Sequence, residues 1–305
     1  MRGHSGRPNS AQSRRDIIHL RRLLPRPSID GRELRPTAAT FCIRKAPVNV
    51  IMIGSEYAGK TTLAVEISKW MIESMGLNMV VWHDHYVVPR SASSSTSTGG
   101  HLTVLRPGAR APDTPYGAYV VRDPDQEDPD DEARESEVLG LSPWLLEQFQ
   151  RHMVWRHLHH SMVRDEDDFL SIGFYYADAV YAPMYYGFGE PGSFADRTRR
   201  ARHWDAEMLG TAPDTVLVLV KASPDVIRER MRAAPRPRSL LKESDVGHAL
   251  DRFEEEYENS LMQRRISLDT SSAPVADTLA EFVDEMRPHL SEKDLLRMVA
   301  RRGTA

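Results

Sequence analysis

One segment sets the architecture that we expect for this chain: Val48-Asn49-Val50-Ile51-Met52-Ile53-Gly54-Ser55-Glu56-Tyr57-Ala58-Gly59-Lys60-Thr61-Thr62. Its first part is apolar and rich in β-branched residues, which predicts a buried strand. The remainder has the phosphate-binding pattern G-x-x-x-x-G-K-[ST], in the required place between a strand and a helix. The helix is predicted because apolar residues continue at helical spacing, at Leu63, Ile67, Trp70 and Met71.

The chemistry of this pattern assigns a role to each part of the loop. Glycines let the backbone curl until its N–H groups point inward and bind an anion, and the start of the helix adds a favourable dipole. Lys60 is expected to reach the β- and γ-phosphates, and the Thr61 hydroxyl is expected to hold Mg²⁺. The predicted nucleotide-binding residues are Gly54, Ser55, Glu56, Tyr57, Ala58, Gly59, Lys60, Thr61 and Thr62. The segment therefore predicts a protein that binds a nucleoside triphosphate.

Composition narrows the class of protein. The chain has 305 residues, 40% of them hydrophobic and 28% charged, which is ordinary for a globular protein. Its net charge of −4 argues against binding to a nucleic acid polymer. Cys42 is the single cysteine, so neither an internal disulfide nor a multi-cysteine metal site can form, and a reducing, cytoplasmic location is expected. Apolar runs such as 216–220 are too short to span a membrane.

The pattern of strands and helices predicts the domain organisation. Strands are predicted at 48–53, 79–82, 169–174, 214–220 and 265–270, with helices between them. This alternation predicts three layers with a roughly five-stranded parallel sheet, and with the phosphate-binding pattern it predicts an α/β fold of the P-loop NTPase type. The predicted domain covers residues 46–290, and a basic tail at 291–305 follows it.

Two segments do not fit this alternation. Residues 1–45 are rich in arginine and interrupted by prolines, and we interpret them as a disordered basic leader; a presequence and a nucleic-acid-binding arm are the alternatives. Residues 90–138 contain a serine-rich tract and an acidic run, which predict a flexible insertion or a lid.

Two further regions are candidates for the acceptor side of the site. Asp84 follows the second predicted strand, and the carboxyl ends of parallel strands border the ligand crevice, so it is either a site residue or a strand-end turn residue. The aromatic segment 175–187 either stacks on a planar ring or forms core beneath a loop.

Arginines lie in a proline-rich loop between two predicted helices. Arg232, Arg236 and Arg238 occupy this region, and a mobile flap that carries arginines suits closure over phosphates. We therefore predict that these three side chains stabilise a transferred phosphoryl group.

On these motifs the chain resembles the P-loop kinases of nucleosides and nucleotides, thymidylate kinase most of all. The segments that carry the resemblance are 54–62, 214–230 and 269–271. The resemblance implies ATP and Mg²⁺ as cofactors, a small-molecule acceptor, and Asp84 as the base or hydroxyl-orienting group. It also implies an acidic residue followed by arginine after the third strand, whereas this chain has Gly173-Phe174-Tyr175-Tyr176 there and Asp178 beyond.

Three functions remain open at this point. The first is ATP-dependent phosphoryl transfer to a nucleoside, nucleotide or other small molecule, with Arg197–Arg202 as a substitute for the missing arginine. The second is a nucleotide-dependent switch or ATPase, against which the absence of any Asn-Lys pair and of a strand ending in Asp-Glu argues. The third is a binding protein without catalytic activity. The predicted helix 142–163 is a candidate face for a homodimer.

Overall fold

A computed structural model describes residues 48–77, 79–83, 101–105, 136–160, 168–236 and 239–302. For 80–83, 101–105, 156, 157, 159, 160 and 302 it describes the backbone alone. The chain divides into two units, Met1–Arg44 and Lys45–Ala305, and all of the described residues belong to the second.

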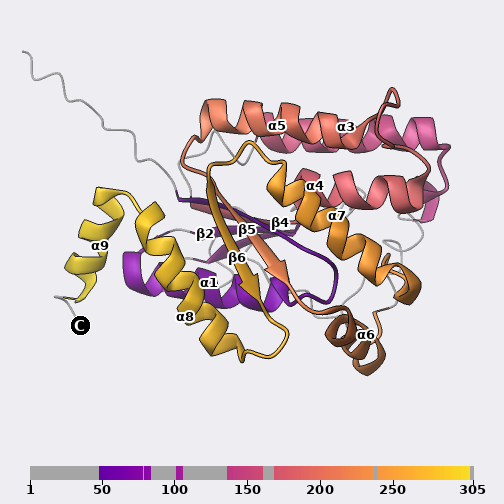
Figure 1. Cartoon of the computed structure of the whole chain (residues 1–305). Helices are drawn as coiled ribbons and strands as arrows, with labels where there is room; N and C mark the ends of the chain where they lie inside the picture. Colours follow the sequence, from indigo (N-terminus) through magenta and orange to yellow (C-terminus); the bar gives the residue numbers. More distant parts are fainter. Residues whose placement is uncertain are drawn as a thin grey trace, which may run out of the picture. The chain divides into compact units, whose positions relative to one another are not determined.

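A six-stranded sheet forms the centre of this unit (Figure 1). Its strands lie in the order β3-β2-β4-β1-β5-β6. They are β1 (Asn49–Ile53), β2 (Met79–His83), β3 (His101–Leu105), β4 (Asp168–Ile172), β5 (Val216–Lys221) and β6 (Arg264–Asp269). All neighbouring pairs are parallel except β2 and β3, which are antiparallel.

Strand β1 lies between β4 and β5 and is buried along its whole length. Its residue Ile51 is in register with Ser171 of β4 and Leu217 of β5. The continuous apolar run explains this position, because a central parallel strand is covered on both faces. The predicted strand, loop and helix are thus present in the expected order, and the loop begins at the middle of the sheet.

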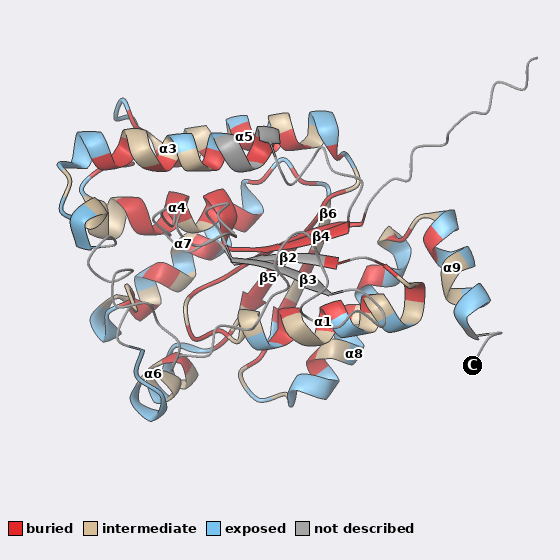
Figure 2. Cartoon of the chain, turned by 180° about the vertical axis from the view of Figure 1, so that it is seen from behind, coloured by how far each residue is buried: buried red, intermediate tan, exposed pale blue. Residues whose placement is uncertain are grey.

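Helices cover both faces of the sheet (Figure 1). They are α1 (Lys60–Met75), α3 (Pro143–His160), α4 (Phe174–Tyr181), η4 (Ala182–Tyr186), α5 (Arg197–Thr211), α6 (Pro224–Ala233), η5 (Glu243–Asp245), α7 (Val246–Glu258), α8 (Val275–Met286), η6 (Arg287–His289) and α9 (Glu292–Arg302). Helices α1 and α8 lie on one face, and α4 and α7 lie on the other. Helices α3 and α5 run side by side outside α4, which is therefore almost entirely buried (Figure 2).

The predicted insertion at 90–138 contains strand β3. It pairs with β2 from Met79↔Leu105 to His83↔His101 and adds an antiparallel edge that the predicted count of about five strands did not include. The segment His101–Leu105 is short and lies between polar, proline-rich sequences, so its strand character depends on pairing with β2 rather than on a long apolar pattern.

The third predicted strand, 169–174, ends earlier than expected. Strand β4 stops at Ile172, and Gly173 has a φ of 87°, which turns the chain into α4. The amide of Gly173 still donates to the carbonyl of Met52 in β1, at 2.8 Å. Phe174 has a φ of 49°, a conformation that is costly for a bulky residue and is maintained here by complete burial.

The predicted basic tail at 291–305 is largely helical. Ser291 begins α9 with a reciprocal cap: its hydroxyl accepts from the amide of Asp294 at 3.2 Å, and its own amide donates to the Asp294 carboxylate at 3.2 Å. The helix packs against α1, with Met298 against the main core. The prediction of a tail depended on the basic residues of this segment, and the apolar residues between them form the face that packs against α1.

Candidate phosphate-binding site

The loop between β1 and α1 is built on two glycines with positive φ. Gly54 has a φ of 140°, and a Cβ at this position would lie 2.2 Å from the carbonyl oxygen of Val220 in β5. Gly59 has a φ of 89° and caps the N-terminus of α1. Between them Tyr57 also has a positive φ, of 62°. Only glycine permits the close approach to β5, so the backbone is free to curl around an anion.

Lys60 points back into the loop. Its Nζ donates to the carbonyl oxygens of Gly54 at 2.7 Å and Ser55 at 2.6 Å. Burial lowers the pKa of Lys60 to about 8, with a smaller lowering effect from Arg236 and an opposing effect from Glu56. The ammonium group therefore lies where an anion would neutralise its charge, and in this structure the two loop carbonyls hold it in that position.

The loop is fastened from the β6 side by Arg230 and Thr270. Arg230 Nη1 donates to the carbonyl of Tyr57 at 3.0 Å, and its Nη2 donates to the carbonyl of Thr270 at 2.6 Å. The Thr270 hydroxyl donates to the carbonyl of Ala58 at 2.8 Å. Neither residue was among the predicted site residues. Arg230 lies two residues before Arg232 on the same helix, within the segment 214–230 that carries the resemblance, and this was the available signal.

The segment after α6 closes over the loop through the side chain of Glu56. This carboxylate accepts from the hydroxyl of Ser239, from the amide of Leu240 at 3.3 Å and from the amide of Leu241 at 3.5 Å. We call residues 234–236 and 239–242 the flap. Glu56 was predicted as a nucleotide-binding residue, and in this structure its carboxylate binds the flap.

A second contact between the loop and the flap involves Tyr57. Its hydroxyl accepts from the amide of Arg236 at 3.0 Å, and the Arg236 guanidinium lies 4.8 Å from the centre of its ring. Arg236, one of the three predicted arginines, thus lies next to the loop. Arg232 is exposed, and its Nε donates to the carbonyl of Arg228 within α6 at 3.2 Å. Arg238 lies outside the described residues.

Tyrosines of α4 and η4 border the loop on the β4 side. The hydroxyl of Tyr181 accepts from the amide of Glu56 at 3.0 Å. The hydroxyl of Tyr185 donates to Asp245 at 3.0 Å, beyond the flap. Burial raises the pKa of both phenols, that of Tyr185 to about 12, so both remain neutral hydrogen-bonding groups near neutral pH.

The remaining predicted residues of the site fall into two groups. Thr61 and Thr62 lie in the first turn of α1, where Thr61 is half-buried and Thr62 is exposed. Asp84 follows β2 but lies outside the described residues. Within the described part of the chain, no cluster of three or more His, Cys, Asp or Glu residues suited to a metal ion is present.

Two of the four arginines in Arg197–Arg202, the segment proposed to replace the missing clamp, are engaged elsewhere. Arg197 is fully buried, and its Nε lies 2.7 Å from Asp178 Oδ2. Arg202 pairs with Asp205 at 3.1 Å and with Glu256 at 3.0 Å. Both residues therefore stabilise the packing of α5, and neither interacts with the phosphate loop.

The aromatic segment after β4 is part of the core. Tyr175 and Tyr176 are fully buried, and their hydroxyls donate to Asp205 Oδ1 at 2.7 and 2.6 Å. Burial, followed by other causes that include Asp205, raises the pKa of both phenols well above the usual range. Of the two interpretations of this segment, core beneath a loop is the one that fits these two residues.

A cavity of about 280 Å³ lies next to the start of the loop. It is bordered by Gly54 and Ser55, by the ends of β5 and β6, and by one side of α7. Asp269 lies at this edge, and its pKa is lowered mainly by the hydrogen bond from Ser271. The loop thus adjoins a space that a small group can enter.

Together the parallel sheet, the curled loop after its central strand and the helix that starts at Lys60 define an α/β fold, and the loop has the sequence pattern of a phosphate-binding loop. No known family model matches the sequence, and no curated protein is similar to it. Among the described residues no helix has the length and apolar character of a membrane span.

Several solved structures are similar in arrangement at low identity. A deoxyadenosine kinase from M. mycoides with bound dATP is 12% identical, with 79% of this chain and 100% of that chain covered and a TM-score of 0.44. A thymidylate kinase from Candida albicans is 12% identical, with 81% and 94% covered and a TM-score of 0.42. A gluconokinase from Sinorhizobium meliloti 1021 is 13% identical, with 80% and 94% covered and a TM-score of 0.38. At these values the likenesses carry no conclusion about what this chain binds.

Proposed function

We propose that this protein is an ATP-dependent kinase that transfers a phosphoryl group to a nucleoside, a nucleotide or another small-molecule acceptor, in the manner of thymidylate kinase. The observation that supports this most directly is the position of Lys60 Nζ inside the curled loop, within 2.7 Å of the Gly54 and Ser55 carbonyl oxygens. A triphosphate would replace these carbonyls as the partner of the ammonium group. The exchange gives Lys60 a stronger, charge-assisted interaction.

The transfer itself needs alignment and charge neutralisation more than covalent chemistry by the protein. An acceptor oxygen forms a bond to the γ-phosphorus, the bond from that phosphorus to the bridging oxygen breaks, and ADP leaves. In the proposal Lys60 and Arg236 neutralise the charge that develops on the transferred group, and Arg232 and Arg238 add to this stabilisation. Asp84 accepts or orients the proton of the acceptor hydroxyl.

Mg²⁺ is proposed as the metal. Thr61 presents a hydroxyl in the first turn of α1, directly after Lys60, and Mg²⁺ is commonly held by one or two protein oxygens together with phosphate oxygens and water. The described residues therefore fit this ion without a dedicated cage of carboxylates. When bound, the ion would screen the negative charge of the β- and γ-phosphates.

The second candidate function is nucleotide binding with hydrolysis, or binding without any turnover. The observation that favours it is the engagement of Arg197 and Arg202 in buried ion pairs, which leaves the arginine clamp of the family without a substitute among those residues. A protein that only binds or hydrolyses ATP does not require such a clamp.

An ADP-release assay with a panel of nucleosides, nucleotides and sugars separates these functions. Release that one acceptor stimulates supports the kinase. Hydrolysis independent of any acceptor supports the ATPase, and tight binding of ATP without release supports the binding protein. Lys60→Met should abolish turnover while circular dichroism remains unchanged, and retained turnover in this variant would overturn the assignment of Lys60.

A further inference from the structure

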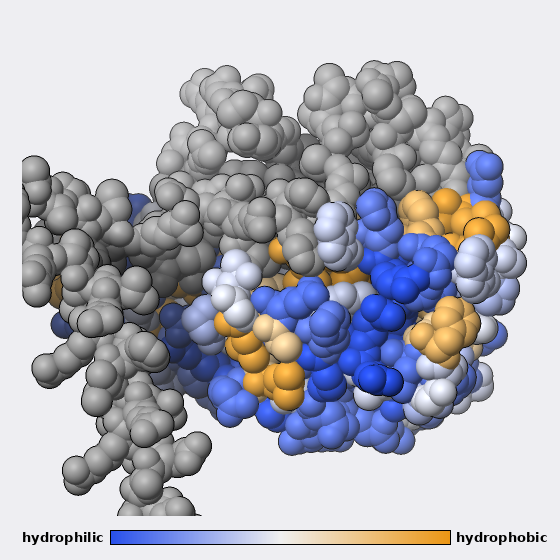
Figure 3. All heavy atoms as spheres, turned by 90° about the horizontal axis from the view of Figure 1, so that it is seen from above, coloured by the Kyte–Doolittle hydropathy of each residue, from blue (hydrophilic) through white to orange (hydrophobic). Residues whose placement is uncertain are grey.

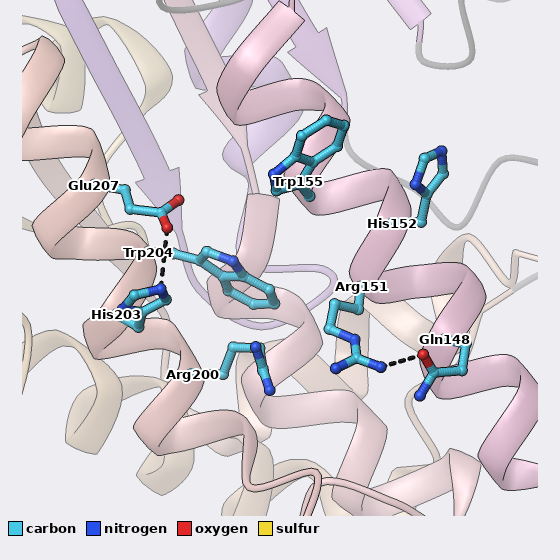
Figure 4. Close-up of a pocket in the computed structure, with 8 residues that line it drawn as sticks. All are labelled: Gln148, Arg151, His152, Trp155, Arg200, His203, Trp204 and Glu207. Carbon is cyan, nitrogen blue, oxygen red and sulfur yellow. Dashed lines mark hydrogen bonds and ion pairs between the residues drawn. The ribbon is translucent and has the colours of Figure 1, made fainter.

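A second cavity, separate from the phosphate loop, lies between α3 and α5 (Figure 4). Its volume is about 350 Å³. It is lined by Gln148, Arg151, His152, Trp155, Arg200, His203, Trp204 and Glu207. None of these residues belongs to the loop or the flap. The described part of this side of the molecule carries many strongly hydrophilic side chains (Figure 3).

Two guanidinium groups face each other across this cavity. Arg151 projects from α3 and Arg200 from α5, and Figure 4 shows both pointing into the space between the helices. Arg151 is held in place by Gln148 and by Glu147, whose Oε2 lies 3.2 Å from Arg151 Nη2. Within the described ranges of the chain, no carboxylate lies at ion-pair distance from Arg200. Two like charges in this arrangement repel each other unless an anion lies between them.

The charged groups behind the cavity do not balance the arginines. Buried Arg197 pairs with Asp178 at 2.7 Å and with Glu147 Oε1 at 3.1 Å, so Glu147 is shared between Arg197 and Arg151. Behind the cavity, three guanidinium groups, those of Arg151, Arg197 and Arg200, thus lie near two carboxylates, those of Glu147 and Asp178. The third carboxylate, Glu207 in the lining, binds His203 instead. Burial, then the charges of Arg151 and Arg197, lowers the pKa of Arg200, and the charges of Glu147 and Asp178 oppose this lowering with smaller effects.

The other residues of the cavity define what else a ligand meets. Glu207 is the one carboxylate in the lining, and His203 Nε2 binds it at 3.0 Å, on the side away from Arg151 (Figure 4). Trp204 forms a buried wall, and Trp155, which is 43% exposed, forms part of the rim. Indole rings present a flat apolar surface against which a planar ring packs well.

We propose that this cavity binds a small phosphate monoester that carries a planar ring, with its phosphate between Arg151 and Arg200 and its ring against Trp155 and Trp204. Guanidinium groups match phosphate oxygens in pairs of parallel hydrogen bonds, which neutral side chains cannot provide. One dianionic phosphate would also remove the repulsion between the two arginines. This site is independent of the proposed kinase function, because no residue of the phosphate loop contributes to it.

Phenyl phosphate is a suitable probe, because it contains only the two groups that the cavity is proposed to recognise. The titration is carried out by saturation-transfer NMR on the full chain bearing Lys60→Met, so that the phosphate loop does not dominate binding. Adding Arg200→Gln should raise the dissociation constant for phenyl phosphate by about tenfold or more, as expected for the loss of a charge-assisted pair. Arg199→Gln, which removes the same charge from an exposed position of the same helix, should change it less than about twofold.

Three results would overturn the proposal. The first is the absence of saturation transfer when phenyl phosphate is present at about 10 mM. This concentration equals the largest dissociation constant that we expect for a specific site of this kind. The second is equal binding by the Arg200→Gln and Arg199→Gln proteins. The third is binding of phenol as tight as that of phenyl phosphate, because then the phosphate contributes nothing. Should Arg200→Gln fail to fold by circular dichroism, Arg151→Gln provides the same comparison from α3.

Discussion

The hydroxyl of Ser239 donates a hydrogen bond to the carboxylate of Glu56, and this contact joins the flap to the phosphate loop across 183 positions of the chain. Together with the amides of Leu240 and Leu241, it makes one side chain of the loop the anchor of the flap. Release of this anchor is therefore the simplest way in which the flap could open.

Replacing Glu56 by alanine should loosen the flap without unfolding the domain. The variant removes the acceptor for three donors, and each such partly buried contact contributes about 0.5–1.5 kcal/mol. Amide exchange at Leu240 and Leu241 should accelerate by roughly tenfold, while exchange in β1 remains unchanged. Glu66→Ala, which removes an exposed carboxylate paired with Lys69 on α1, is the control. Unchanged exchange at Leu240 in Glu56→Ala would contradict the anchoring role.

The affinity for ATP should fall as the pH rises through the pKa of Lys60, which is about 8. A lowered pKa means that the buried amine loses its proton within this range, and the neutral amine attracts phosphate poorly. If only the ammonium form binds, affinity falls by roughly thirtyfold between about pH 7 and about pH 9.5. Calorimetry in buffers of different ionisation enthalpy should also show proton uptake on binding near pH 8.

The same pKa has a consequence for folding. Because the unfolded chain holds the Lys60 proton up to a higher pH than the native protein does, stability from this group rises with pH between the two pKa values and is lost below about 8. In Lys60→Met both pH effects should disappear. A wild-type affinity for ATP that is flat over this range would show that Lys60 keeps its proton.

Arg230→Met should weaken ATP binding although Arg230 is not expected to contact the nucleotide. Its guanidinium holds the carbonyls of Tyr57 and Thr270, so its loss frees one side of the loop. We expect about 2 kcal/mol less stability in urea unfolding and roughly tenfold weaker ATP binding. Arg228→Met on the same helix removes an exposed pair with Asp225 and should cost less than about 0.5 kcal/mol. Equal effects of the two substitutions would refute the positioning role of Arg230.

Asp205→Ala should be among the most destabilising substitutions in the chain. Its carboxylate accepts from Tyr175, Tyr176 and the amide of Leu261 and pairs with Arg202, so removal leaves several buried groups without a partner. We expect a loss of about 3–5 kcal/mol by urea unfolding. Tyr176→Phe should cost about 1 kcal/mol and leave ATP affinity unchanged. A large loss of ATP affinity in Tyr176→Phe at unchanged stability would indicate that the aromatic segment contributes to the binding site.

Much of the fold could be predicted from sequence patterns that extend over only a few residues. The apolar run of β1, the Gly54 and Gly59 pair and the cap at Ser223, whose hydroxyl accepts from the amide of Val226 at 3.4 Å, all act over a few residues. Strand β3 and helix α9 could not be read in the same way. The first depends on its pairing with β2, and the second on an apolar face that packs against α1.

For the site, the sequence by itself determined the curled loop that we propose binds phosphate, because its glycine spacing and one lysine act locally. Only the tertiary structure decided which other residues surround it. Arg230 and Thr270 lie at the loop, and the hydroxyls of Tyr175 and Tyr176 are turned to Asp205. The physical reason is that an arginine or a tyrosine has the same chemistry in a core ion pair and in a ligand site. Its role depends on which distant segment packs beside it, and no local pattern encodes that.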